Sequence, residues 1–185
     1  IESVEFSGNN NTILTGSIWQ IYDDNIPKDI SRGFTLANAE SIKITGAEHH
    51  NQNQKEVIKW YFESIVSQPF NYSKYPLDKM EINLLIHHKD INKNVILIPD
   101  LDAYPKVNPR SIRPSIKSDF VLPGWYMKNS FFHYKIYGYD TYFEMDKQIE
   151  KRNFPNLYFT IVIQRDFLNP FIGKILPIIV VGIVG

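Results

Sequence analysis

The chain contains no cysteine and has no excess of charge of either sign. Without cysteine it forms no disulfide and offers no thiolate, so disulfide-stapled scaffolds and thiol enzymes are excluded. Twenty Lys and Arg residues are balanced by twenty Asp and Glu residues, and the formal net charge is zero. Because a neutral chain has no overall basic field to attract a phosphate backbone, we expect no nucleic-acid partner.

The sequence also lacks the short motifs that mark common catalytic sites. It has no Gly-x-Ser-x-Gly, no Gly-rich phosphate loop and no His-Glu-x-x-His. A hydrolase would need a Ser, a His and an Asp brought together by the fold with no local signature. We therefore expect a binding protein and not an enzyme, with a secreted β-sandwich hydrolase as the most distant alternative.

Aromatic and β-prone sequence is abundant, with 12 Phe, 11 Tyr and 3 Trp among the 185 residues. Apolar and polar residues alternate in short runs that are separated by Pro, Gly and Asn, which is typical of antiparallel strands. Together they predict an all-β antiparallel sandwich of about nine or ten strands. A polar stretch at 51–56 is the one candidate for a short helix. The clearest strand candidates are 3–8, 12–22, 40–48, 56–66, 79–88, 94–101, 126–139 and 156–165.

The C-terminal run at 175–185 has no charged or polar side chain. It is shorter than the roughly 20 residues that cross a membrane, and in isolation it also fits a core strand or a buried helix. However, Arg165 stands shortly before it, and Pro170 lies where a helix can begin at an interface. We interpret 169–185 as the start of a transmembrane helix and 1–168 as a domain, so both ends look cut from a longer protein.

A second informative stretch is Tyr75-Pro76-Leu77-Asp78, which lies between two strand candidates. By itself this sequence is an ordinary turn, with Pro at its second position and Asp at its end. Further along the chain, a strand candidate ends at Arg165 and leads into the apolar run. The combination is more specific than either part.

These features resemble the extracellular domain of pentameric ligand-gated ion channels, in the prokaryotic form that lacks the loop cysteines. Tyr75 to Asp78 resembles the signature loop, and Arg165 resembles the arginine that precedes the first membrane helix. The stretch at 16–24 is similar to the family's second strand, and Trp125 within 122–127 is similar to the Trp that opens the ninth strand. The resemblance covers nearly the whole chain, although 33–60 is shorter and more polar than the family pattern.

The resemblance implies an immunoglobulin-like sandwich on the extracellular or periplasmic side of a cell membrane. It also implies a homo-oligomer, specifically a pentamer, that binds a small molecule between subunits and couples this binding to a pore. The alternative function is a sensory or carbohydrate-binding β-sandwich attached to another membrane output. The pore-lining helix of the family has no counterpart within 1–185.

Ligand binding in this family uses aromatic side chains from neighbouring subunits, whose ring faces attract ammonium groups. An amine is therefore the favoured ligand class. For each candidate the alternative is a packing or interface role, since Tyr and Trp are common in both. By resemblance, the candidates are Trp19 and Tyr22 on one subunit face, His87 and His88 at the start of a binding loop, and Tyr137, Tyr139 and Tyr142 before the last strand.

The resemblance further assigns Tyr75, Pro76, Asp78 and Arg165 to the coupling of sensor and pore. An arginine beside a low-dielectric slab is costly unless a carboxylate pairs with it, and a bidentate pair also fixes geometry. We therefore expect Asp78 and Arg165 to be bonded. The alternative is a local turn Asp with an Arg that extends to the lipid headgroups.

Metal binding is a minor expectation. Asp100 and Asp102 lie on one face if their segment is extended, and their oxygens suit Ca²⁺, so they are the candidate calcium ligands. The adjacent pair His87 and His88 points to opposite faces of a strand and does not converge on one ion. No other cofactor is expected.

Overall fold

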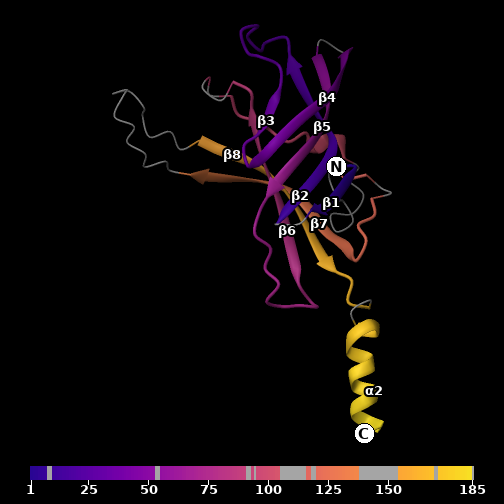
Figure 1. The fold of residues 1–185 in the computed structure, drawn as a ribbon. Helices are drawn as coiled ribbons and strands as arrows, with labels where there is room; N and C mark the ends of the chain where they lie inside the picture. Colours follow the sequence, from indigo (N-terminus) through magenta and orange to yellow (C-terminus); the bar gives the residue numbers. More distant parts are fainter. Residues whose placement is uncertain are drawn as a thin grey trace.

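The structure is a computed structural model that describes residues 1–7, 10–52, 55–90, 93, 95–104, 116–117, 120–137, 154–168 and 171–184. In this part of the chain, antiparallel strands form two four-stranded sheets (Figure 1). This confirms the prediction of a mostly antiparallel all-β architecture. The strands are β1 (Ser3–Ser7), β2 (Asn11–Asp23), β3 (Phe34–Leu36), β4 (Ala39–Gln52), β5 (Lys55–Ser67), β6 (Lys79–His88), β7 (Trp125–Tyr137) and β8 (Phe154–Arg165).

The first sheet has the order β1-β2-β5-β4 and is built from three successive antiparallel pairings. The turn between β1 and β2 contains Asn10 at a φ of 64°, a left-handed conformation that Asn tolerates better than most residues. β4 and β5 pair up to Gln52 and Lys55. The short helix expected at 51–56 is therefore wrong, because this polar sequence closes a hairpin.

The second sheet has the order β3-β6-β8-β7, so β8 pairs with a strand on each side. β6 shows most clearly why these residues form a strand: its side chains are buried at every second position from Met80 to His88. This period of two matches the alternation in the sequence. It also places the neighbouring histidines His87 and His88 on opposite faces, as predicted.

The core lies between the two sheets and combines apolar side chains from both. Leu14 and Phe62 come from the first sheet, and Ile82 and Ile161 from the second are fully buried cross-strand partners. Burying such side chains contributes about 1.5–3 kcal/mol each relative to leaving them exposed. The core therefore holds the two sheets face to face and fixes which side of each strand is available for a site.

Two sequence predictions fail around the second sheet. Residues 95–100 join no strand ladder, and the chain instead crosses the sandwich and turns through a 3-10 helix, η2 (Leu101–Ala103). β3 was not predicted because its three residues are too few to show a period. The described residues thus contain the eight strands of the two sheets, fewer than the nine or ten predicted.

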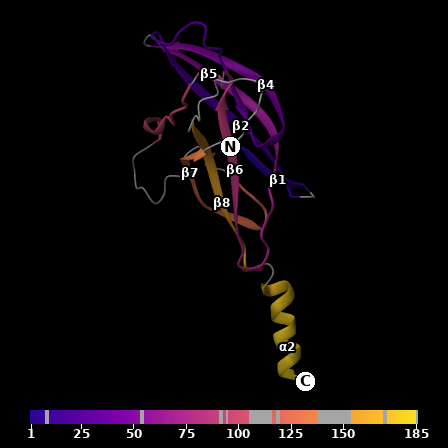
Figure 2. The ribbon, with the colours of Figure 1, turned by 90° about the vertical axis from the view of Figure 1, so that its left-hand side faces the viewer.

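Beyond β8 the chain becomes helical, first as a π-helix, η3 (Phe171–Ile175), and then as α2 (Leu176–Val184). This helical segment projects from one end of the sandwich in both side views (Figures 1 and 2). Within the described residues, no helix has the length and apolar character needed to cross a membrane.

Candidate functional site: an arginine clamp and an internal cavity

A bidentate ion pair joins the end of β8 to the residue that precedes β6. Arg165 donates from Nε to Asp78 Oδ1 at 2.8 Å and from Nη2 to Asp78 Oδ2 at 3.0 Å. The backbone N–H of Arg165 also donates to the carbonyl of Asp78 at 3.1 Å. The contact expected between these two residues is therefore present, and it fixes both charge and orientation. Asp78 and Arg165 are called the clamp below.

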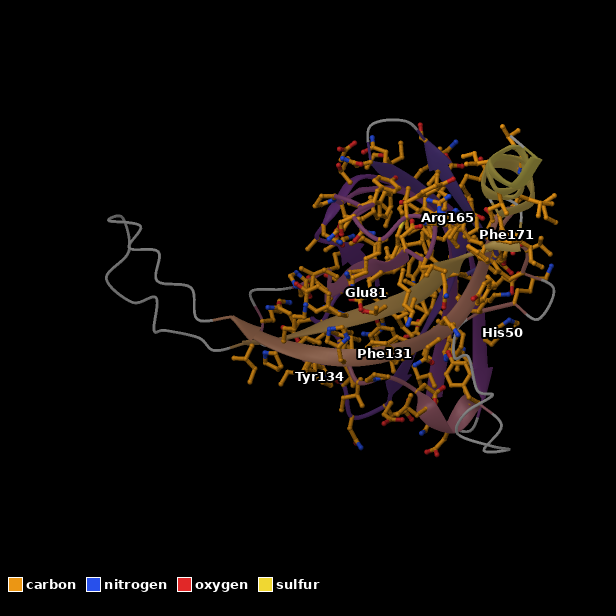
Figure 3. The ribbon with its side chains drawn as sticks, turned by 90° about the horizontal axis from the view of Figure 1, so that it is seen from below. His50, Glu81, Phe131, Tyr134, Arg165 and Phe171 are labelled. Atoms are coloured by element: carbon orange, nitrogen blue, oxygen red, sulfur yellow. The ribbon has the colours of Figure 1, made fainter. Side chains whose placement is uncertain are left out.

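Local structure explains why Asp78 reaches this position. Two successive turns precede it, in which Tyr75 N–H donates to Tyr72 C=O at 3.0 Å and Leu77 N–H donates to Lys74 C=O at 2.7 Å. The loop and the end of β8 lie at the end of the sandwich from which the helical segment leaves (Figure 1). Figure 3 views this end and shows Arg165 among the strands and Phe171 beside the helix.

Aromatic rings flank the guanidinium of Arg165. Its Cζ lies 4.2 Å from the ring centroid of Trp125 and 5.2 Å from that of Tyr75. Trp125 opens β7 after a turn at Gly124, whose φ of +77° is readily adopted only by glycine. Sequence reasoning noted Trp125 but gave it no contact with Arg165, because nothing in the sequence shows that β7 and β8 are neighbours.

The two residues of the clamp differ in burial, and the aspartate is the more buried of the two. The side chain of Asp78 is 1% exposed and that of Arg165 is 21% exposed. Hydrogen bonding to Asp78 raises the pKa of the Arg165 guanidinium above its usual value, and the opposite charge of Asp78 acts in the same direction. Arg165 therefore remains charged, and Asp78 has the cation that a buried carboxylate needs.

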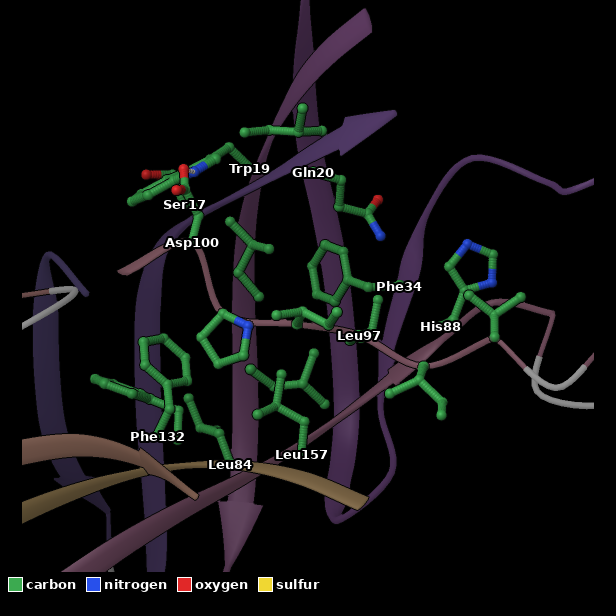
Figure 4. A pocket seen from close by; sticks show the side chains of 18 of the residues that line it. Ser17, Trp19, Gln20, Phe34, Leu84, His88, Leu97, Asp100, Phe132 and Leu157 are labelled. Atoms are coloured by element: carbon green, nitrogen blue, oxygen red, sulfur yellow. Dashed lines mark hydrogen bonds between the residues drawn. The ribbon is translucent and has the colours of Figure 1, made fainter. Parts of the chain in front are cut away.

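A cavity of about 460 Å³ lies between the two sheets (Figure 4), and neither residue of the clamp lines it. Its walls come from β2, β3, β5, β6, β7 and β8, and the crossing segment 95–100 covers it on one side. A volume of this size falls in the range of about 300–1,000 Å³ that holds small ligands. Most of the wall is apolar, including Ile18, Phe34, Phe62, Leu84, Ile86, Phe132, Leu157 and Phe159.

One end of the cavity has a buried polar network. Gln20 donates from Nε2 to the carbonyl of Gly33 at 3.1 Å and accepts from Trp60 Nε1 at 2.9 Å. The N–H of Gly33 donates to Tyr22 Oη at 3.3 Å, and the guanidinium of Arg32 lies 4.1 Å from the Tyr22 ring centroid. These bonds hold Gln20 and Tyr22 in place, so this end of the cavity is rigidly framed.

His88 lies beside this network (Figure 4). Its Nδ1 accepts the backbone N–H of Asp90 at 3.0 Å, so the neutral ring carries its hydrogen on Nε2. Nε2 is buried and has no hydrogen-bond partner among the described residues. Burial lowers the pKa of His88 below its usual range; Asp90 opposes this effect, while Arg32 and Lys93 add to it. His88 is therefore neutral at pH 7.

We expect this burial to make the protein less stable in acid. Because the folded state lowers the pKa of His88, the unfolded chain binds a proton more readily, and stability decreases as the pH falls below about 6.5. His88→Gln, which retains an acceptor for the Asp90 N–H, should show a smaller loss of stability between about pH 7.5 and about pH 5. Urea unfolding at both pH values measures the difference. His50→Gln, an exposed position, is the control, and equal losses in the two variants would contradict the prediction.

The candidate ligand residues divide into three groups in the structure. Trp19, Tyr22 and His88 all line the cavity, and Tyr22 and His88 are only 5% and 3% exposed. The sequence placed all three on faces between subunits, but the side chains of Tyr22 and His88 are turned inward, between the sheets of one chain. Trp19 alternates with the buried Gln20 and Tyr22 along β2 and is only partly buried. His87 points the other way, with its Nε2 2.8 Å from Asn156 Oδ1.

The tyrosines expected to form the rest of the cage are not described. Tyr137 is the last residue of β7, but its side chain lies outside the described part. Tyr139 and Tyr142 lie outside the described residues altogether. The intersubunit cage therefore stays a prediction.

The geometric basis for a calcium site is missing. The chain turns through η2 at Leu101–Ala103, so Asp100 and Asp102 do not share the face of an extended segment. Asp100 Oδ2 instead accepts Trp19 Nε1 at 3.1 Å. Within the described residues, no group of three or more His, Asp or Glu side chains is placed to hold a metal ion.

Sequence reasoning missed the cavity and the segment that covers it. Residues 95–100 were predicted as a strand, yet they cross the sandwich, where Leu97 C=O accepts Tyr134 Oη at 2.6 Å. A signal was available in Pro99, which has no N–H for a ladder, and in consecutive apolar residues with no polar alternation. The cavity itself depends on how two sheets pack, which no local pattern reveals.

No protein-family model matches the chain, and no curated protein matches it.

Proposed function

We propose that this chain is the outer ligand-sensing domain of a pentameric ligand-gated ion channel subunit. The observation that carries the proposal is the clamp, in which a buried Asp78 holds Arg165 at the point where the sandwich passes into a helical segment. The sequence resemblance requires this pair, and a merely local turn Asp would not need an arginine 87 positions away.

The clamp supports a mechanism in which the sandwich moves the helix. Arg165 is the last residue of β8, and η3 begins at Phe171, so few residues separate the clamp from the helical segment. Phe171 N–H donates to Phe167 C=O at 3.0 Å, and Asp166 N–H donates to Gly124 C=O at 2.9 Å. A displacement of the loop that contains Asp78 is thus passed to β8 and onward to the helix.

The proposal also includes the type of sandwich, the role of the C-terminal segment and the location of the domain. The sandwich is taken to be immunoglobulin-like, and 169–185 to be the start of the first membrane helix, with the domain outside the cell membrane. Exposed apolar side chains on β7 support assembly with other subunits, since such positions are unfavourable in water and suited to interfaces. They are Tyr126, Phe131, Tyr134 and Ile136, which are 44%, 36%, 43% and 66% exposed.

Assembly of the longer subunit tests the proposal. We expect the detergent-solubilised full-length protein to have five times the subunit mass, because heterologous contacts of this family close as a ring. The 185-residue chain should assemble weakly or not at all, since residues 1–185 include no counterpart of the family's pore-lining helix. Native mass spectrometry of both proteins measures this. A monomeric or dimeric full-length protein would overturn the proposed function.

A further inference from the structure

The cavity between the sheets contains one acidic group in a mostly apolar wall. Asp100 is the only carboxylate among the described residues that line it, and its side chain is half-buried. One oxygen, Oδ2, accepts Trp19 Nε1 at 3.1 Å. The ring of Trp19 lies 5.9 Å from that of Tyr104, with the planes tilted by 45°. A carboxylate and two aromatic rings therefore meet at one end of an apolar space.

This combination selects a class of occupant. A carboxylate only accepts hydrogen bonds and attracts positive charge, and aromatic faces attract cations by their quadrupole. An anion would be repelled by Asp100, and a sugar would leave most of its hydroxyl groups against apolar walls without partners. A metal ion would find one carboxylate and no further His, Asp or Glu cluster in the described residues.

The rest of the cavity accommodates an apolar body. Phe34 lines one region of the wall, while Phe132, Leu157 and Leu84 line another (Figure 4). Phe62 also lines the cavity, with its ring centroid 6.0 Å from that of Phe34. With a volume of about 460 Å³, the cavity is large enough for a bicyclic aromatic ring with a short side chain. Flat rings suit a space that lies between two packed sheets.

We propose that a single chain binds a small arylalkylamine in this cavity. The ammonium group lies at Asp100, Trp19 and Tyr104, and the aromatic ring lies between the sheets. This site is formed within one subunit, whereas the ligand site of the proposed function lies between subunits. The inference therefore does not rest on the proposed function, and either one can fail without the other.

The covering segment 95–100 gives the ligand a route into the cavity. Its side chains Ile96 and Ile98 line the cavity and yet are 51% and 82% exposed. The segment belongs to no strand ladder and is tied to the sandwich by side-chain bonds, from Tyr134 to Leu97 C=O and from Trp19 to Asp100. Such ties are more easily broken than a ladder of backbone bonds.

Three matched probes test the proposal on the purified chain by isothermal titration calorimetry. They share an indole ring and differ in charge: tryptamine is a cation, 3-ethylindole is neutral and indole-3-propionate is an anion. We expect tryptamine to bind at least about tenfold more tightly than 3-ethylindole, because one charge-assisted hydrogen bond is of this size. Indole-3-propionate should bind most weakly of the three.

Variants locate the site. Asp100→Asn retains an acceptor for Trp19 and should weaken tryptamine binding by about tenfold while leaving 3-ethylindole unchanged. Asp102→Asn is the matched control, since Asp102 is exposed and does not line the cavity, and it should leave all affinities unchanged. Leu157→Trp adds bulk to the cavity wall and should remove binding of both tryptamine and 3-ethylindole.

Thermal unfolding followed by circular dichroism establishes that each variant is folded before titration. The proposal is overturned if tryptamine does not bind, if it binds no better than 3-ethylindole, or if Asp100→Asn leaves its affinity unchanged. Binding that persists in folded Leu157→Trp also overturns it. A pentameric full-length protein with no tryptamine site would refute this inference and leave the proposed function standing.

Discussion

Replacing Arg165 by alanine is expected to lower the free energy of unfolding by about 3 kcal/mol. The substitution leaves the carboxylate of Asp78 buried, at 1% exposure, without the cation that lies 2.8 Å from it. A buried charge without a partner is among the most destabilising changes in a protein. Urea unfolding monitored by circular dichroism gives the difference between the parent chain and the variant.

The matched control is Arg32→Ala. Arg32 also pairs with a carboxylate at 2.8 Å, from Nε to Glu56 Oε2, but its side chain is 27% exposed and that of Glu56 is 32% exposed. Because solvent screens this pair, we expect a loss of about 1 kcal/mol or less. If Arg165→Ala lowers the free energy of unfolding by no more than Arg32→Ala does, the buried clamp does not stabilise the fold more than an exposed ion pair.

A double-mutant cycle separates the pair from its surroundings. The swap of Asp78→Arg with Arg165→Asp should recover part of the loss, with a coupling energy of about 1 kcal/mol or more. In the full-length protein the same swap should partly restore gating, if coupling runs through the clamp. Additive effects in both measurements would show that the two residues act independently.

Replacing Ile82 by alanine is expected to cost about 3 kcal/mol of stability, within the range of about 2–5 kcal/mol for large-to-small core changes. Ile82 lies at the middle of β6, is fully buried and pairs across the ladder with Ile161, which is also fully buried. The change removes apolar contacts in the core between the two sheets. Chemical denaturation measures the shift.

Glu81→Ala is the control for Ile82, since it is the adjacent position on the same strand and its side chain is exposed. A change of about 0.5 kcal/mol or less is expected there. Similar losses at both positions would mean that β6 does not present alternate residues to core and solvent in the register described.

The strand pattern was largely predictable because each strand shows its own period. In β6 the alternation that buries Ile82 and exposes Glu81 is visible in the sequence without any tertiary information. The segment at 95–100 was mispredicted because consecutive apolar residues fit a strand and also fit a cover over an apolar cavity. Only the packing of the two sheets decides between them.

The clamp could be predicted in part from the sequence, whereas the cavity could not. The contact of Asp78 with Arg165 was predictable, because the sequences around both residues resemble two segments that meet in the ligand-gated channel family. Trp125 was not expected to stack on Arg165, because this contact depends on the pairing of β7 with β8. Tyr22 and His88 were expected to face another subunit, but they occupy buried alternate positions of β2 and β6 and point between the sheets. No local pattern shows whether a face of a strand is covered by the same chain or by another subunit.

The position of β8 inside its sheet has a mechanical consequence. A pull on the helical segment acts along β8, which is paired with β6 on one side and with β7 on the other. Tension along the strand axis loads the hydrogen bonds of both ladders together in shear, so they resist in parallel, whereas a pull across the sheet would open them one after another. An edge strand in the same place would yield with one ladder only. The strand that carries Arg165 is therefore a stiffer attachment point for a load from the helix than an edge strand of this sheet would be.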